Sequence, residues 1–410
     1  MEVIHQNCAG LDVHKKSVMA CVRKQDGKKV HRETQKFATT TEGLVELFDW
    51  LAAAGCTHVV MESTGIYWRP VWRVLEGGPE LVLANAASVK NVPGRKSDVN
   101  DAQWLADLLA HGLVRGSFVP PKDQQERREL TRTRRQLIRE QVQHKQRIQK
   151  VLEVCNIKLA SVISDITGKT GRAILDALAK GEVDPIKLAD LAQGTIKRDK
   201  WLEVAKSLRG SVSAHDRFLL SMHLRMLDAL QAEIDLADAR LEEVASAGFS
   251  DAVTRLTSIP GISDVAAKVI LAEVGLDMSV FPSADHLVSW AGLCPRMDES
   301  AGKRRDTRVR DGDPWLKPVL VQCAWGAARS KGSYIASFFH RIRARRGEKK
   351  AVVATAAKLL RIVYALLESG DEYDERGPEH LSEEEKARQA MRLLRRLDNL
   401  GFRVDVRSAA

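Results

Sequence analysis

Four acidic residues occupy positions from which their carboxylates could act together on a phosphodiester. Asp12 ends a first apolar segment, Glu62 follows the apolar segment 58–61, and Asp98 and Asp101 open a helical stretch. The i,i+3 spacing of the last two places both carboxylates on one helical face, one turn apart. Phosphodiester cleavage uses two divalent metals about 4 Å apart, and Mg²⁺ prefers oxygen ligands. The pattern therefore predicts a Mg²⁺ site that draws on all four residues.

Each of these acids also has an ordinary structural explanation. Asp98 could be a helix N-cap or a first-turn acid favoured by the helix dipole, and Glu62 could be a surface residue that enters a turn. His14 is better read as structural or phosphate-facing than as a metal ligand, because no second histidine is nearby. One acid at the end of a strand is weak evidence for a metal site, whereas four acids at matching element ends are considerably stronger evidence.

The elements that must position these acids lie in the first 118 residues, which read as an α/β segment. A hairpin turn signal, Gln25-Asp26-Gly27, separates two of the strand-like segments. The expected order is strands 3–13, 17–23 and 28–34, a helix over 42–53 capped by Thr41, strand 57–61, helix 67–75, strand 80–84 and helix 98–111. This order predicts a mixed sheet flanked by helices, as in the ribonuclease-H-like architecture.

A long basic helix follows Pro120-Pro121. Residues 122–150 carry ten Lys and Arg against four Asp and Glu, and no Gly or Pro occurs from 122 to 167. We expect a solvent-exposed helix, with a coiled-coil dimer as an open alternative, and Arg132, Arg135 and Arg139 as nucleic-acid contacts. The regions expected along the whole chain are 1–118 (α/β), 119–168 (long helix), 169–249 (a run of shorter helices), 250–368 (a compact, mainly helical block) and 369–410 (a charged tail).

The block 250–368 contains a second candidate site. Ser258-Ile259-Pro260-Gly261-Ile262 between two helical segments has a helix-hairpin-helix pattern, in which Pro260, Gly261 and Ile262 could hold a DNA phosphate; a tight helix–helix turn is the alternative. Ser300 lies in a short loop before a basic run, so its hydroxyl would have phosphate-binding cations beside it. Serine in such a loop is usually a turn residue, and the other possible nucleophile, Cys294, is more readily core packing.

Two basic runs in this block are candidates for contact with a polyanion. Residues 329–350 contain eight Lys and Arg against one acid, and solvated helix faces are the alternative explanation. The candidate contacts from the two runs are Lys303, Arg304, Arg305, Arg308, Arg343 and Arg346.

The composition excludes several other classes of protein. The 410 residues have a net charge of +10, 44% are hydrophobic, and no apolar stretch is long enough for a membrane span. The six cysteines are scattered without a C-x-x-C pair, which argues against a zinc ribbon or disulfide scaffold and favours a reducing cytoplasm. We expect no signal peptide, and no phosphate-binding P-loop is complete.

Taken together, the motifs resemble the DEDD-type transposases of the insertion-sequence-110 family. The N-terminal block carries Gly10–Lys15 (GLDVHK), Met61–Gly65 (MESTG) and the KSD-x-x-DA stretch of 96–102, and the C-terminal block carries Ile259–Ile262 (IPGI), Ala272–Gly275 (AEVG) and the AGL-x-P stretch before Ser300. The family has a glycine pair after its serine, where this chain has Ala301-Gly302.

The resemblance implies a RuvC-like first domain with Asp12, Glu62, Asp98 and Asp101 as a Mg²⁺-binding set and Ser300 as the nucleophile. Lys15, beside the carboxylates, is a further candidate contact for nucleic acid. The resemblance also implies a recombinase that acts on donor and target DNA, is guided by a structured non-coding (bridge) RNA, and works in the bacterial cytoplasm at the nucleoid as a dimer or a dimer of dimers. A serine loop that meets the carboxylates would form a 5′-phosphoserine link. The alternatives are a hydrolytic RuvC-like junction resolvase and a non-catalytic nucleic-acid-binding protein.

Overall fold

The computed structural model divides the chain into two compact units, Met1–Pro120 and Pro121–Ala410. It describes residues 3–62, 65–84, 100–114, 116–295, 298–300, 303–306, 308–309, 312–375, 377 and 383–402, with the backbone alone at 100, 298–300, 303–306 and 383–389. Asp98 therefore lies outside the described residues.

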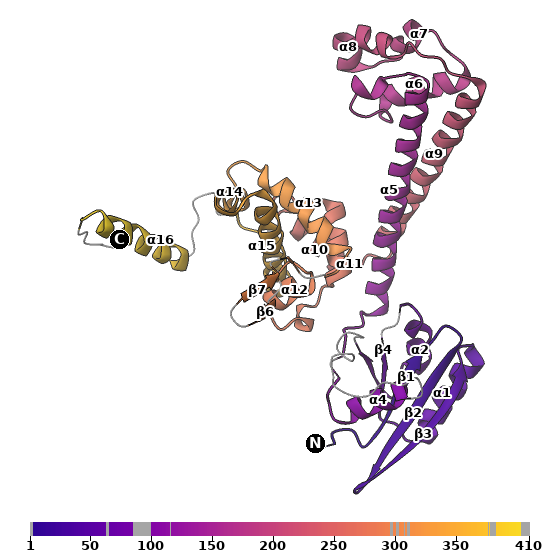
Figure 1. Cartoon of the computed structure of the whole chain (residues 1–410), viewed down its shortest axis with the longest axis vertical. Coiled ribbons are helices and arrows are strands. Elements are labelled where there is room, and N and C mark those ends of the chain that lie inside the picture. The colour runs from indigo at the N-terminus through magenta and orange to yellow at the C-terminus, as the bar shows by residue number, and fades with distance from the viewer. Residues whose placement is uncertain are drawn as a thin grey trace. The chain divides into compact units, whose positions relative to one another are not determined.

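The first unit is built on a five-stranded mixed sheet of order β3-β2-β1-β4-β5 (Figure 1). β1 pairs antiparallel with β2 and parallel with β4, β2 pairs antiparallel with β3, and β4 pairs parallel with β5. The elements are β1 (Asn7–Val13), β2 (Ser17–Asp26), β3 (Lys29–Ala38), α1 (Thr41–Ala53), β4 (His58–Glu62), α2 (Trp68–Leu75), β5 (Glu80–Ala84) and α4 (Asn100–Ala110). The mixed sheet flanked by helices is confirmed.

Side-chain alternation along β1 gives the sheet two different faces. Ala9, Leu11 and Val13 point to the face covered by α1 and α2 and belong to its buried cluster. Cys8 points to the opposite face, where it joins the buried leucines of α4. Gly10 and Asp12 continue the Cys8 series, so Asp12 lies on the α4 face of the sheet.

The second unit begins with two long helices that pair in antiparallel fashion, α5 (Lys122–Val154) and α9 (Ala214–Glu243) (Figure 1). The direction follows from two contacts between them: Gln141 donates to Gln231 at 3.0 Å, and His144 faces His223 at 3.2 Å. The shorter helices of this segment share a buried cluster with the end of α5: η1 (Leu159–Ser161), α6 (Lys169–Lys180), α7 (Pro185–Asp190) and α8 (Gly194–Ser207).

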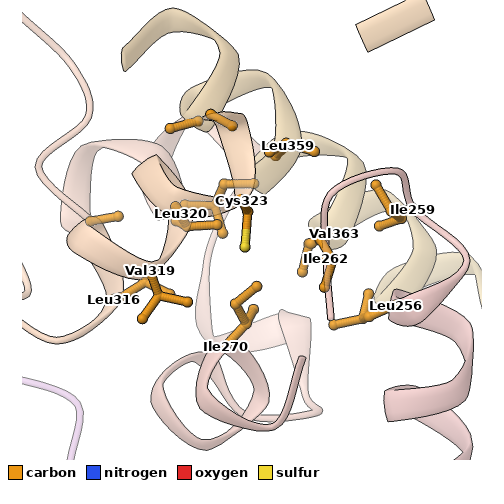
Figure 2. Close-up of a cluster of buried hydrophobic side chains, with 14 of the residues drawn as sticks. Leu256, Ile259, Ile262, Ile270, Leu316, Val319, Leu320, Cys323, Leu359 and Val363 are labelled. Atoms are coloured by element: carbon orange, nitrogen blue, oxygen red, sulfur yellow. The ribbon is translucent and has the colours of Figure 1, made fainter. Parts of the chain in front are cut away.

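A separate hydrophobic cluster organises the rest of the second unit (Figure 2). This part of the chain contains α10 (Ala247–Thr257), α11 (Asp264–Val274), η2 (Met278–Val280), α12 (Ala284–Trp290), the hairpin β6 (Asp298–Ser300) and β7 (Lys303–Asp306), α13 (Leu316–Ala328), α14 (Tyr334–Arg346) and α15 (Glu348–Ser369). The helix α16 (Glu383–Asn399) follows them. Within the described part of the chain, none of the helices is long and apolar enough to cross a membrane.

Two details of the expected helices are corrected. The expected run of short helices contains α9, which is 30 residues long, because Ser213 and Asp216 form a capping box and no Gly or Pro follows before Gly248. The first helix is capped by Thr40 rather than by Thr41, since the Thr40 hydroxyl accepts a hydrogen bond from the Gly43 amide.

Candidate active site

Asp12 and Glu62 stand beside each other at the carboxyl ends of two neighbouring parallel strands. Leu11 pairs with Met61 in the register of β1 and β4, so the next residue of each strand is Asp12 and Glu62. Adjacent strands are about 4.8 Å apart, and both residues belong to the side-chain series on the α4 face. Two of the four predicted carboxylates are thus brought together, each half-buried.

Gly10 brings α4 against the same strand. A Cβ atom at Gly10 would lie 2.2 Å from the Ala102 carbonyl oxygen and 2.6 Å from the Ala106 amide nitrogen, so only glycine permits this approach. Asp101 precedes Ala102 in the first turn of α4, and Asp12 lies two residues beyond Gly10. The first turn of α4 is therefore packed beside the strand end that carries Asp12.

A buried ion pair fixes α4 from the side of β2. The Arg23 side chain, 3% exposed, donates from Nε to Asp107 Oδ1 of α4 at 2.9 Å, and Arg32 donates from Nη2 to the same oxygen at 2.9 Å. Because breaking a buried pair by removing one partner is costly, Asp107 holds the helix, and with it Asp101, in place.

The remaining neighbours of Asp12 are consistent with a phosphate-facing edge. His14 Nε2 lies 3.0 Å from Asp12 Oδ2, and the Lys15 side chain is exposed, with its backbone carbonyl accepting from the Thr39 hydroxyl at 2.8 Å. No group of three or more His, Cys, Asp or Glu side chains that could hold a metal occurs among the described residues, which do not include Asp98.

Ser300 is the last residue of β6 and not a loop residue as expected. It pairs with Lys303 across the β6–β7 hairpin, and Glu299 pairs with Arg304. Pro295 and Val309 form an antiparallel bridge at the root of this hairpin. The candidate nucleophile and the start of its basic run are thus brought together by the backbone register.

The other predicted basic residues of this region lie on or near this hairpin. Lys303, Arg304 and Arg305 fall in β7, and the Arg308 side chain is exposed. Cys294 is half-buried against the hydrophobic cluster, in keeping with a packing role.

The predicted phosphate-binding turn between α10 and α11 is packed inward. Ile259 and Ile262 are buried in the hydrophobic cluster (Figure 2), and the Ile262 amide donates to the Ile259 carbonyl at 3.1 Å. Gly261 has φ +90°, and a Cβ there would lie 2.5 Å from the Cys323 carbonyl oxygen. Asp264 in the first turn of α11 already supplies a negative charge at that helix terminus. These contacts favour the structural explanation of this turn, in which Pro260 is only half-buried.

The three predicted arginines of α5 surround one indole ring. The guanidinium carbons of Arg132, Arg135 and Arg139 lie 5.5, 5.9 and 5.5 Å from the Trp315 ring centroid, and Arg135 donates to the Trp315 carbonyl at 2.8 Å. Burial and the neighbouring Arg139 lower the pKa of Arg135. This Arg–Trp cluster joins α5 to the segment before α13.

Glu273, which the sequence reasoning missed as an anchor, holds Arg132 in that cluster. Its side chain is fully buried, and its two oxygens accept from Arg132 Nε and Nη2 at 2.8 and 2.7 Å. Burial raises the pKa of Glu273, against the lowering effect of the Arg132 hydrogen bonds. The available signal was a single charged residue, Glu273, within the otherwise apolar stretch 269–274. By contrast, Arg343 and Arg346 at the end of α14 are exposed.

Comparison with known proteins identifies two sequence families in the chain. A transposase family model of the DEDD type (DEDD_Tnp_IS110) matches residues 9–157, and the transposase IS116/IS110/IS902 family matches residues 253–340. Together the two matches cover more than half of the chain.

Curated relatives agree with these matches. The transposase for insertion sequence element IS1111A of Coxiella burnetii is 25% identical over 89% of this chain and 90% of its own length. A Sinorhizobium fredii protein described as a transposase, y4pF/y4sB, is 28% identical over 68% of this chain and 64% of its own length. The pilin gene-inverting protein of Moraxella bovis is 30% identical over 30% of this chain and 38% of its own length. The chain belongs to the IS110 family of transposases.

Proposed function

We propose that this transposase cuts and rejoins donor and target DNA strands through a covalent serine intermediate. The observation that carries the proposal is the placement of Asp12 and Glu62 at adjacent strand ends, with the first turn of α4 packed against the same strand at Gly10. The strand order of the sheet supports a ribonuclease-H-like, RuvC-like assignment for this unit.

Asp12, Glu62, Asp98 and Asp101 would hold Mg²⁺. The donor set fits this ion, because carboxylate oxygens are the ligands it prefers and two of them already stand side by side. When bound, the metal stabilises negative charge on the phosphate oxygens. His14, 3.0 Å from Asp12, orients that carboxylate, and Lys15 attracts the DNA backbone.

Ser300 is the proposed nucleophile. Its Oγ forms a bond to the phosphorus of the scissile phosphodiester while the bond to the 3′ oxygen breaks, which leaves a 5′-phosphoserine and a free 3′-hydroxyl. The serine hydroxyl loses one proton and the leaving 3′ oxygen gains one, so the step balances. The reverse reaction on a partner strand restores the phosphodiester, so no nucleotide hydrolysis is needed.

The proposal includes a structured non-coding bridge RNA, action as a dimer or a dimer of dimers, and a place in the bacterial cytoplasm at the nucleoid. The exposed Arg147 and Lys150 of α5, which lie apart from the Arg–Trp cluster along the helix, support a second polyanion beside DNA. RNA that co-purifies with the protein and maps next to its gene would bear this out.

Ser300→Ala and Asp12→Asn test the chemistry separately. Both variants should stop strand exchange, and only the wild-type protein should give a DNA-linked species that survives denaturation. If Ser300→Ala cleaves DNA junctions at the full rate, water is the nucleophile and the protein is a hydrolytic RuvC-like resolvase. If Asp12→Asn retains strand exchange, the carboxylate assignment fails.

A further inference from the structure

A cavity of about 600 Å³ lies at the root of the hairpin that carries Ser300. Pro295 and Val309, the bridge that closes the hairpin, both line it. Ser300 is five residues from Pro295, and an extended chain spans at most about 3.4 Å per residue, so its Cα lies within about 17 Å of this wall. The cavity is thus close to the proposed nucleophile.

The floor of the cavity is apolar. It is formed by Phe338 and Ile342 of α14 and by Val353, Ala354 and Ala357 of α15. Phe338 is half-buried and is the aromatic residue of the lining, and the Arg341 guanidinium carbon lies 5.8 Å from its ring centroid. Such a floor suits a flat apolar group, and aromatic side chains at sites of this kind stack on nucleobases.

The rim of the cavity is cationic. Arg346, Lys349 and Lys350 line it and are exposed, and none of the described carboxylates pairs with them. A fourth cation, Arg361, is held by Asp285 at 2.8 Å. The described lining contains no acidic residue. An apolar floor with three available cations around it complements a base attached to an anionic backbone.

We propose that this cavity binds an unstacked nucleotide of the DNA strand next to the scissile phosphate. The base lies on Phe338 and the small residues of α15, and the flanking phosphates contact Arg346, Lys349 and Lys350. The inference rests on the proposed function for the identity of the strand as DNA. A bound nucleotide at this distance would hold the strand on the hairpin while Ser300 reacts.

The first test fills the floor without changing charge. The full-length protein is titrated, in EDTA, with a fluorescein-labelled 15-nucleotide oligothymidylate, and binding is followed by anisotropy. Ala354→Trp should weaken binding at least about five-fold, the low end for loss of one stacked base. Ala365→Trp, on an exposed position of the same helix that does not line the cavity, should bind like the wild type. Equal affinity of both variants overturns the proposal.

The second test changes only exposed charge, so folding is not at risk. Lys349→Ala with Lys350→Ala should reduce the slope of log affinity against log salt by about 1.4, at about 0.7 per contact with a single strand. Lys180→Ala with Lys187→Ala, on α6 and α7, is the matched control and should leave the slope unchanged. An unchanged slope in the first pair refutes the cationic rim.

The strand assignment is tested with oligouridylate of the same length. Tighter binding of the RNA, with the same sensitivity to Ala354→Trp, would make the cavity an RNA site and overturn the DNA assignment. Because binding is measured without metal, this outcome is independent of catalysis. If Asp12→Asn retains strand exchange while Ala354→Trp loses binding, the proposed function fails and the cavity proposal stands.

Discussion

Glu273 should be among the most sensitive positions for the stability of the second unit. Its carboxylate has no exposed surface and accepts two hydrogen bonds from Arg132. Arg128 Nε lies 3.4 Å from Glu273 Oε2. Glu273→Ala would leave the Arg132 guanidinium without the acceptor of its two hydrogen bonds, whereas Arg128 would keep the backbone carbonyls of residues 272 and 273 as acceptors. Removing one partner of a buried pair costs about 3–5 kcal/mol.

The lower end of this range is expected here. The Arg132 side chain is 28% exposed, so it can regain water, and it keeps its contact with Trp315 and a 3.7 Å approach to Asp313. We therefore expect a loss of about 3 kcal/mol in the free energy of unfolding, measured by urea denaturation. Hydrogen exchange should locate the loss in α5 and α11.

Glu242→Ala is the matched control. Glu242 pairs with Lys268 but is 59% exposed, and an exposed pair contributes about 1 kcal/mol or less. A loss below about 1 kcal/mol in Glu273→Ala, no larger than that of the control, would refute the reasoning. A double-mutant cycle with Arg132→Met should show that the two effects are far from additive, because the same pair is removed twice.

Three other perturbations have expected outcomes. Gly10→Ala should abolish strand exchange and destabilise the first unit by about 1–3 kcal/mol, measured by thermal melting, because its Cβ would collide with α4. Burial lowers the pKa of His144 and of His223, so the unfolded chain binds more protons than the folded chain. The free energy of unfolding should therefore fall as the pH falls below about 6.5. A variant with both His144→Gln and His223→Gln should lose this part of the pH dependence. Arg343→Ala should lower the salt slope of DNA binding, whereas Arg132→Ala should chiefly lower stability.

The adjacency of Asp12 and Glu62 could be predicted from the sequence because strand alternation and strand ends are local signals. The contact that places α4 could not, because Gly10 is a single glycine among many and its role depends on Ala102, some ninety residues later. The hairpin at Gly27, with φ +55°, is confirmed. The glycine and the basic run that follow Ser300 favour a short loop there, yet Ser300 itself belongs to β6 and pairs with Lys303.

The partner of α5 was harder to predict than α5 itself. The sequence leaves a coiled-coil dimer open at α5. The glycines that favour shorter helices over 169–249 all lie outside α9 (Gly171, Gly181, Gly194, Gly210 and Gly248). The capping box of Ser213 and Asp216 and the glycine-free stretch after it were sufficient to predict α9. In the structure α9 of the same chain packs along α5.

A charge count overstates the charge that a polyanion would meet. Arg132 and Arg135 belong to the basic run of α5, but Glu273 and the Trp315 carbonyl already accept their hydrogen bonds. Releasing either one to a phosphate would cost the protein a buried contact, so the number of counterions released on binding should be smaller than the net charge of +10 suggests. Arg346, Lys349 and Lys350, at the end of α14 and the start of α15, are exposed and line the cavity at the root of the serine hairpin. Position within the fold, and not abundance in the sequence, therefore decides which arginines and lysines can bind nucleic acid.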